Sequence, residues 1–204
     1  MAESQRTEEQ LILVTDSEGY PVQELAAICY DLTSNSVKDV FLNWAKLPYK
    51  DNDWFARKHI HGLSPDFLQA HGLENEAALV ADFHTWRQKY VINEIFAHAP
   101  HKEEVLLNLR ITDVALCPWA ERCKDFDFKR TLVFKILNIP IHGTTCYLEH
   151  AHKAYEGWRH TRKGSLGDIA RQEYGHHCAL YDCVYILLHK FPQSCHNLIQ
   201  ALEE

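Results

Sequence analysis

Two short motifs, far apart in the chain, carry the residues best suited to chemistry. Asp16 and Glu18 follow the first apolar run of the 204-residue sequence, and a later segment reads His177-Cys-Ala-Leu-Tyr-Asp182. Side chains at i and i+2 of a strand share a face, so Asp16 and Glu18 can reach one metal ion. A helix beginning near His177 places residues 177 and 182 within about a turn and a half of each other. Three carboxylates can bind divalent cations and a histidine can accept a proton, which suits metal-assisted hydrolysis of a phosphodiester.

The composition predicts one soluble domain. Hydrophobic residues make up 46% of the chain and charged residues 24%, which is ordinary for a globular protein. No stretch approaches the roughly 18 consecutive apolar residues of a membrane span. Residues 1–10 are polar and acidic, unlike a signal or transit peptide, and are expected to form a disordered tail before a single domain at 11–204. We therefore expect an intracellular protein, cytoplasmic or nuclear rather than secreted, with no membrane partner.

The cysteine and histidine counts and the net charge bear on whether the protein has disulfides, binds metals or binds nucleic acid. Seven cysteines, an odd number in a reducing compartment, argue against a disulfide framework. Fourteen histidines alongside them justify a search for metal ligands. The net charge of −7 differs from the basic balance of most nucleic-acid-binding proteins. A nuclease that neutralises phosphates through its metals tolerates an acidic balance.

The apolar patterns predict alternating strands and helices. Short apolar or alternating runs predict strands at 11–15, 23–30, 37–44, 94–97 and 111–116, with a hairpin turn at 33–36. Amphipathic or capped segments predict helices near 65–70 and at 75–90, 103–109, 126–137, 165–174, 177–190 and 194–202. The segment 140–162 has no clear period. Three strands in a meander, then alternating helices and strands, then closing helices indicate an α/β fold.

The two motifs, in this order, resemble those of the DEDDh 3′–5′ exonucleases of the ribonuclease H-like superfamily, over roughly residues 11–190. The segment 165–175 also resembles the helix that precedes the last motif in that family. The resemblance implies a ribonuclease H-like fold, with a central mixed sheet flanked by helices. It further implies that Asp16, Glu18 and Asp182 bind two Mg²⁺ or Mn²⁺ ions and that His177 takes the proton from the attacking water.

The middle motif departs from the family. An aspartate is expected after the fourth strand, but the segment 96–107 offers only Glu103 or Glu104. Glutamate can still bind a hard divalent cation, although its longer side chain shifts the carboxylate. A displacement of roughly 1 Å can cost about a hundredfold in rate. Glu103 is taken as the fourth catalytic acid, with Glu104 as the alternative.

A narrower resemblance suggests a second metal. The strings 16–19, 22–26 and 177–183 are similar to the exonuclease domain of arenavirus nucleoproteins and to the Maelstrom domain of germline small-RNA pathway proteins. These groups share a structural zinc bound by Glu, Cys, His and Cys. The resemblance implies the following zinc ligands: Glu24, Cys146, His150 and Cys178, with His152 or Cys123 as substitutes. Zinc would order the segment 140–162, whereas the simpler alternative is that Cys146 and Cys178 are buried apolar residues.

Residues 150–163 interleave cations with aromatic rings. The cations are Lys153, Arg159, Arg162 and Lys163, and the rings are Tyr155 and Trp158. Cations neutralise phosphates and aromatic faces stack on bases, although a solvated basic surface has the same composition. The leading prediction is a metal-dependent 3′–5′ exonuclease acting on single-stranded RNA, with DNA or another nucleic acid as a further substrate. The alternatives are a catalytically weak or inactive Maelstrom-like RNA-binding domain with protein partners in an RNA-silencing complex, and a protein-interaction scaffold.

Overall fold

The protein is an α/β structure built on a mixed sheet. The computed structural model describes residues 9–46, 63, 65–116, 141–143 and 179–192. The strands are β1 (Leu11–Glu18), β2 (Glu24–Asp31), β3 (Ser36–Trp44), β4 (Glu94–Ala97), β5 (Thr112–Asp113) and β6 (Ile141–Gly143). The helices are α2 (Pro65–His71), α3 (Glu76–Arg87), α4 (His101–Leu107) and α9 (Ala179–Lys190). The helices expected at 126–137, 165–174 and 194–202, and most of the expected tail, lie outside the described residues.

Within the described residues, the sheet has six strands in the order β5-β4-β1-β2-β3-β6. β1, β2 and β3 form the expected antiparallel meander, while β4 pairs with β1 in parallel and β5 with β4 in parallel. β1 and β2 occupy the centre of the sheet and are buried on both faces, which explains the continuous apolar runs at 11–14 and 25–30. The predicted α/β class, with a central mixed sheet flanked by helices, is confirmed.

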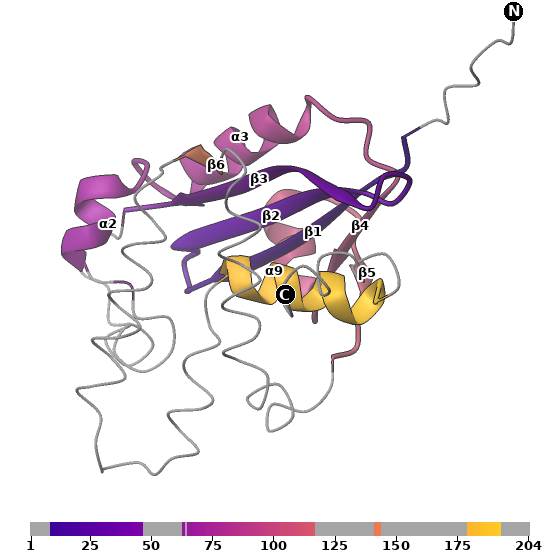
Figure 1. The fold of residues 1–204 in the computed structure, drawn as a ribbon. Helices are drawn as coiled ribbons and strands as arrows, with labels where there is room; N and C mark the ends of the chain where they lie inside the picture. The colour runs from indigo at the N-terminus through magenta and orange to yellow at the C-terminus, as the bar shows by residue number, and fades with distance from the viewer. Residues whose placement is uncertain (1–8, 47–62, 64, 117–140, 144–178, 193–204) are drawn as a thin grey trace, which may run out of the picture.

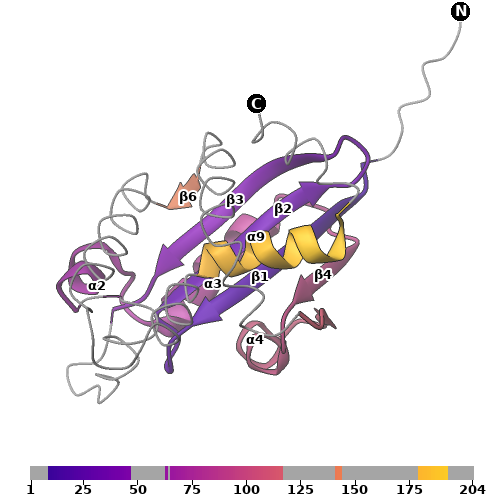
Figure 2. The same ribbon diagram turned by 60° about the horizontal axis from the view of Figure 1, so that its bottom comes forward.

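Helices cover both faces of this sheet (Figure 1). α9 crosses β1 and β2 on one face, and α3 lies on the other, as the turned view also shows (Figure 2). Alternation along the strands separates two apolar clusters: Ile12 and Val14 pack toward α9, whereas Leu11 and Leu13 pack toward α3. The side chain of every second residue on β1 therefore faces α9.

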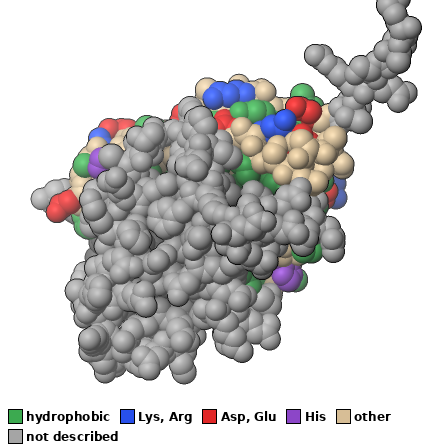
Figure 3. Space-filling model, in the orientation of Figure 1, with side chains coloured by type: hydrophobic (Ala, Val, Ile, Leu, Met, Phe, Trp, Pro, Cys, Tyr) green, Lys and Arg blue, Asp and Glu red, His purple; other side chains and the backbone are tan. Residues whose placement is uncertain are grey.

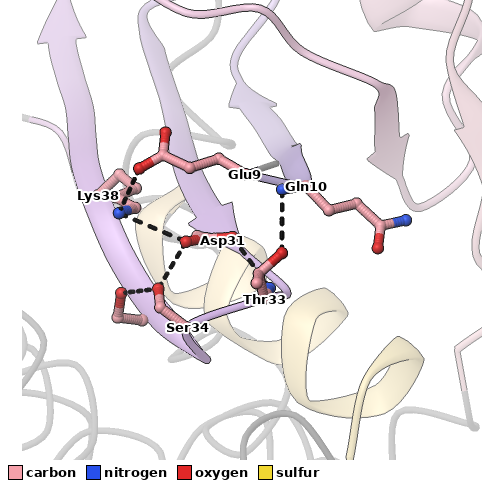
Figure 4. Close-up of polar contacts among 7 residues, drawn as sticks. Glu9, Gln10, Asp31, Thr33, Ser34 and Lys38 are labelled. Atoms are coloured by element: carbon pink, nitrogen blue, oxygen red, sulfur yellow. Dashed lines mark hydrogen bonds and ion pairs between the residues drawn. The ribbon is translucent and has the colours of Figure 1, made fainter. Parts of the chain in front are cut away.

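The β2–β3 turn is held by Asp31 at the end of β2 (Figure 4). Its carboxylate accepts hydrogen bonds from the Thr33 amide at 2.9 Å and the Ser34 hydroxyl at 2.6 Å, and pairs with Lys38 at 3.4 Å. Asn35 supplies the left-handed backbone conformation that the turn requires, with φ of 50°. This is the turn predicted at 33–36.

α3 is fixed at both ends. Asn75 caps its start by accepting a hydrogen bond from the Ala78 amide at 2.9 Å. Near its end, Trp86 Nε1 and the Tyr90 hydroxyl both donate to Asp39 Oδ2 on β3, at 2.7 and 2.6 Å. These bonds to Asp39 fix the helix against the face of the sheet opposite α9.

Several predicted boundaries differ from the structure, among them the end of the helix predicted at 75–90, which stops at Arg87, and one strand was missed. The helix expected at 103–109 runs instead from His101 to Leu107, because Asn108 adopts a left-handed conformation that ends it. The strand expected at 111–116 is only Thr112–Asp113. Residues 141–143, within the segment expected to be irregular, form β6, which pairs in parallel with β3.

Among the described residues, no helix is both long and apolar enough to cross a membrane. The described surface visible in the space-filling view carries acidic and basic side chains close together (Figure 3). A uniformly basic face is therefore not present on that part of the described surface.

Candidate metal centre

The end of β1 positions the first two carboxylates. β1 continues three residues beyond its predicted end, so Asp16 and Glu18 both lie on the strand, paired with Ala26 and Glu24 of β2. Because side chains alternate, both carboxylates project from the face that α9 covers. The spacing of two residues along a strand thus brings both acids to one place.

α9 supplies the third carboxylate, Asp182. One side of this helix is buried against β1 and β2. The buried apolar residues on that side of α9 are Ala179, Leu180, Cys183, Val184, Ile186 and Leu187. Their burial fixes the rotation of the helix, and ligand atoms of Asp16, Glu18 and Asp182 all lie within 4.8 Å of one another. The predicted convergence of these three carboxylates is confirmed.

Glu24 fixes the start of α9. Its Oε1 accepts a hydrogen bond from the Ala179 amide at 3.0 Å, and its Oε2 accepts one from Trp44 Nε1 at 3.3 Å. A carboxylate at a helix N-terminus satisfies an otherwise unpaired amide and complements the helix dipole. The Cys183 thiol, one turn along, lies 3.5 Å from the Ala26 carbonyl oxygen. These contacts set the register that brings Asp182 to β1.

The cluster is electrostatically suited to a cation. Burial raises the pKa of Asp16 well above its ordinary range, and the carboxylates of Asp182, Glu18 and Glu103 raise it further. Lys102 opposes this shift but does not outweigh it. Closely spaced carboxylates repel one another unless a proton or a cation lies between them. Three hard oxygen donors at this spacing fit a divalent cation such as Mg²⁺ or Mn²⁺.

Glu103 and Glu104 differ sharply in position. Glu103, in the first turn of α4, is buried and accepts a hydrogen bond from the Ser17 hydroxyl. It lies close enough to Asp16 to affect its pKa, yet it is outside the group of three whose ligand atoms converge. Glu104 instead accepts a hydrogen bond from the Ile111 amide at 3.1 Å. Of the two glutamates considered from the sequence, only Glu103 lies beside the cluster.

Sequence reasoning missed Ser17 and Lys102. Ser17 stands between the two acids of β1, and Lys102 Nζ donates to its backbone carbonyl at 3.0 Å. Strand alternation could have pointed to Ser17, because a residue between two ligands must face the opposite side of the sheet. The sequence holds no comparable signal for Lys102, whose contact depends on how α4 packs against β1.

Several predicted site residues cannot be placed. His177, and the expected zinc ligands Cys146, His150 and Cys178, lie outside the described residues. The same is true of the substitute ligands Cys123 and His152 and of the segment 150–163. Of the predicted zinc set, only Glu24 is described, and this residue is 1% exposed.

Comparison with known proteins adds no relative. No protein-family model matches the chain, and a search of curated proteins finds no match.

Proposed function

We propose that this protein is a metal-dependent 3′–5′ exonuclease of ribonuclease H-like fold that hydrolyses phosphodiester bonds of RNA. The observation that carries the proposal is the convergence of Asp16, Glu18 and Asp182 within 4.8 Å. Two of these acids come from the first strand and the third from a helix about 160 residues later. A chain gains no stability from gathering carboxylates. Cation binding is the function that offsets this repulsion.

The strand topology supports the proposal that this α/β fold is ribonuclease H-like. A three-strand meander followed by parallel β4 and β5 agrees with the order implied by the resemblance to ribonuclease H-like exonucleases. Asp16 and Glu18 lie at the end of β1 and Asp182 lies on α9, which supports the proposal because the resemblance expects these three residues on the first strand and on a late helix. The similarity to the Maelstrom and arenavirus-type domains makes single-stranded RNA the preferred substrate, with DNA as a second.

In the proposed hydrolysis, the described acids and His177 would have different roles. Asp16, Glu18 and Asp182 would hold two Mg²⁺ or Mn²⁺ ions, which supply a Lewis acid for the phosphoryl oxygens and lower the pKa of water. α9 would keep Asp182 in register through its buried face and through Glu24. His177, two residues before the described start of α9, would accept the proton of the attacking water, since an imidazole titrates near neutral pH.

A structural zinc forms part of the proposal. Glu24 would be one ligand, and Cys146, His150 and Cys178 would complete a tetrahedral set. Its support is the position of Glu24, whose carboxylate already contacts the residue next to Cys178 in sequence. Such a zinc would bind beside the start of α9 and stabilise the helix that carries Asp182.

One observation favours a second candidate function. Glu103 accepts a hydrogen bond from Ser17 and does not join the three converging carboxylates. A site with three acids instead of four fits a Maelstrom-like RNA-binding domain with weak or absent catalysis, acting with protein partners in an RNA-silencing complex. A binding domain retains affinity for RNA when the cation is removed, whereas a two-metal nuclease loses cleavage.

The test is a cleavage assay with end-labelled single-stranded RNA and DNA in Mg²⁺, Mn²⁺ or EDTA. We expect stepwise shortening from the 3′ end that requires the cation and fails when the 3′ end is blocked. Asp182→Asn should abolish shortening, while Asp66→Asn, an exposed acid on α2, should leave it unchanged. RNA binding that persists in EDTA without any shortening would support the RNA-binding function instead.

A further inference from the structure

We infer that Glu103 is a positioning residue: through the Ser17 hydroxyl it holds the strand end that carries Asp16 and Glu18, without binding the cation itself. The inference rests on the proposed cation centre. It assigns this acid a different role from the fourth metal ligand that the motif comparison implies.

α4 contacts Ser17 in two ways. The Ser17 hydroxyl donates to Glu103 Oε1, and Lys102 Nζ donates to the Ser17 carbonyl oxygen at 3.0 Å. Ser17 is 7% exposed and Glu103 is 4% exposed, so water does not compete freely for this hydrogen bond. Two adjacent residues of α4 therefore hold both the side chain and the backbone of one strand residue.

This residue is where β1 needs support. The parallel pairing of β1 with β4 runs from Ile12 to Val14, whereas the pairing with β2 continues to Glu18. The strand end that bears both acids thus projects beyond its β4 ladder. Because buried backbone oxygens require hydrogen-bond donors, the Lys102 contact satisfies a carbonyl beyond the point where the ladder ends.

Alternation makes the effect specific. Ser17 faces α4 while its neighbours Asp16 and Glu18 face α9, so a shift of Ser17 moves both carboxylates together. Hydrogen-bonding partners behind metal ligands typically contribute 10–100-fold to metal affinity because they fix ligand orientation. Glu103 is placed to act in this way on two ligands at once.

The experiment measures Mn²⁺ binding to the full chain by electron paramagnetic resonance of the free ion. We expect Ser17→Ala to weaken Mn²⁺ binding about tenfold. Ser17→Thr keeps a hydroxyl and should bind Mn²⁺ as the unmodified chain does. Glu103→Ala should weaken binding to the same extent as Ser17→Ala. The double variant should be no weaker than either single one, because both changes remove one interaction.

Glu103→Gln keeps an oxygen acceptor and should retain Mn²⁺ affinity within a few-fold. Glu104→Gln, on the same turn but bonded to Ile111, is the matched control and should match the unmodified chain. Thermal melting in EDTA tests whether each variant folds. Ser17→Thr and Glu103→Gln should fold, because they nearly preserve the size and the polarity of the side chain.

Two results would overturn the inference. One is normal affinity in Ser17→Ala with a loss above tenfold in Glu103→Gln, the pattern of a direct ligand. The other is normal affinity in all Ser17 and Glu103 variants. The unmodified chain separates this test from that of the proposed function: if it binds no Mn²⁺, the cation centre fails and the inference fails with it. If it binds Mn²⁺ but does not cleave RNA, only the nuclease proposal fails.

Discussion

Asp31 and Asp16 are carboxylates of neighbouring strands whose surroundings act in opposite directions. Burial raises the pKa of Asp31, but hydrogen bonds from Ser34, Thr33 and Lys38 outweigh it and hold that pKa at about 2. For Asp16 the nearby carboxylates add to burial, and its pKa lies well above the ordinary range. The charge on Asp31 therefore stabilises the fold, whereas the charge on Asp16 destabilises it until a cation is bound.

Asp31 gives a pH prediction. Its folded-state pKa of about 2 is below the ordinary value of 3.8, so its contribution is fully present above about pH 4. That contribution is lost as the pH falls through the folded-state pKa. Asp31→Asn should remove stability on the order of 1 kcal/mol at pH 7, after allowance for solvent screening, and almost none at pH 2. Urea unfolding at both pH values measures this, with Asp66→Asn as control, and an equal loss at the two would contradict it.

At the scale of elements, the β1–β2 connection begins with a glycine that no other residue replaces easily. Gly19 has φ of +89°, and a Cβ there would lie 3.0 Å from the Gln23 side chain. Because Glu18 directly precedes it, strain at Gly19 reaches the cation centre.

We therefore expect Gly19→Ala to destabilise the fold by about 1–2 kcal/mol and to weaken Mn²⁺ binding. Asn35→Gly is the control, since it removes a side chain from another left-handed turn position and should change stability by less than about 0.5 kcal/mol. Thermal melting and Mn²⁺ titration measure both effects. Unchanged stability in Gly19→Ala would show that the turn relaxes without cost.

Elements with a strong pattern could be predicted from the sequence. The meander, β4, α3 and α9 follow from apolar periodicity and turn residues, because burial of one face decides each of them. β6 could not be predicted, since three residues, Ile141-His-Gly143, carry no period and become a strand only by pairing with β3. The end of α4 was missed because Asn108 stops the helix through its backbone conformation, while the apolar pattern continues to Leu109.

The candidate site also contains residues that the sequence could predict and residues that it could not. The convergence of Asp16, Glu18 and Asp182 could be predicted from the sequence, because strand alternation and a buried helix face fix where their side chains project. The choice between Glu103 and Glu104 could not be made. Both lie in the first turn of α4, and only the docking of that helix against Ser17 distinguishes them.

At the scale of the whole molecule, the cation would join the first described strand to the last described helix. A ligand that binds only the folded state stabilises it by about 2.7 kcal/mol at a hundred times its Kd. For a domain of this size the melting temperature should rise by about 5–10 °C. Asp16→Asn should melt higher than the unmodified chain in EDTA, because it relieves carboxylate repulsion, and should lose the increase with Mn²⁺. Calorimetry with and without Mn²⁺ measures both, and an equal Mn²⁺ shift in the variant would exclude Asp16 as a ligand.

The position of α9 also determines the order in which the protein can fold during its synthesis. Glu24 and Ala179, which meet at the start of α9, are 155 positions apart. At roughly 5–20 residues per second, a ribosome needs on the order of 10–30 s to pass from one to the other. Throughout that interval α9 itself is not available to cover its part of this face of β1 and β2. The carboxylate cluster is therefore completed by Asp182 only after α9 has emerged and docked.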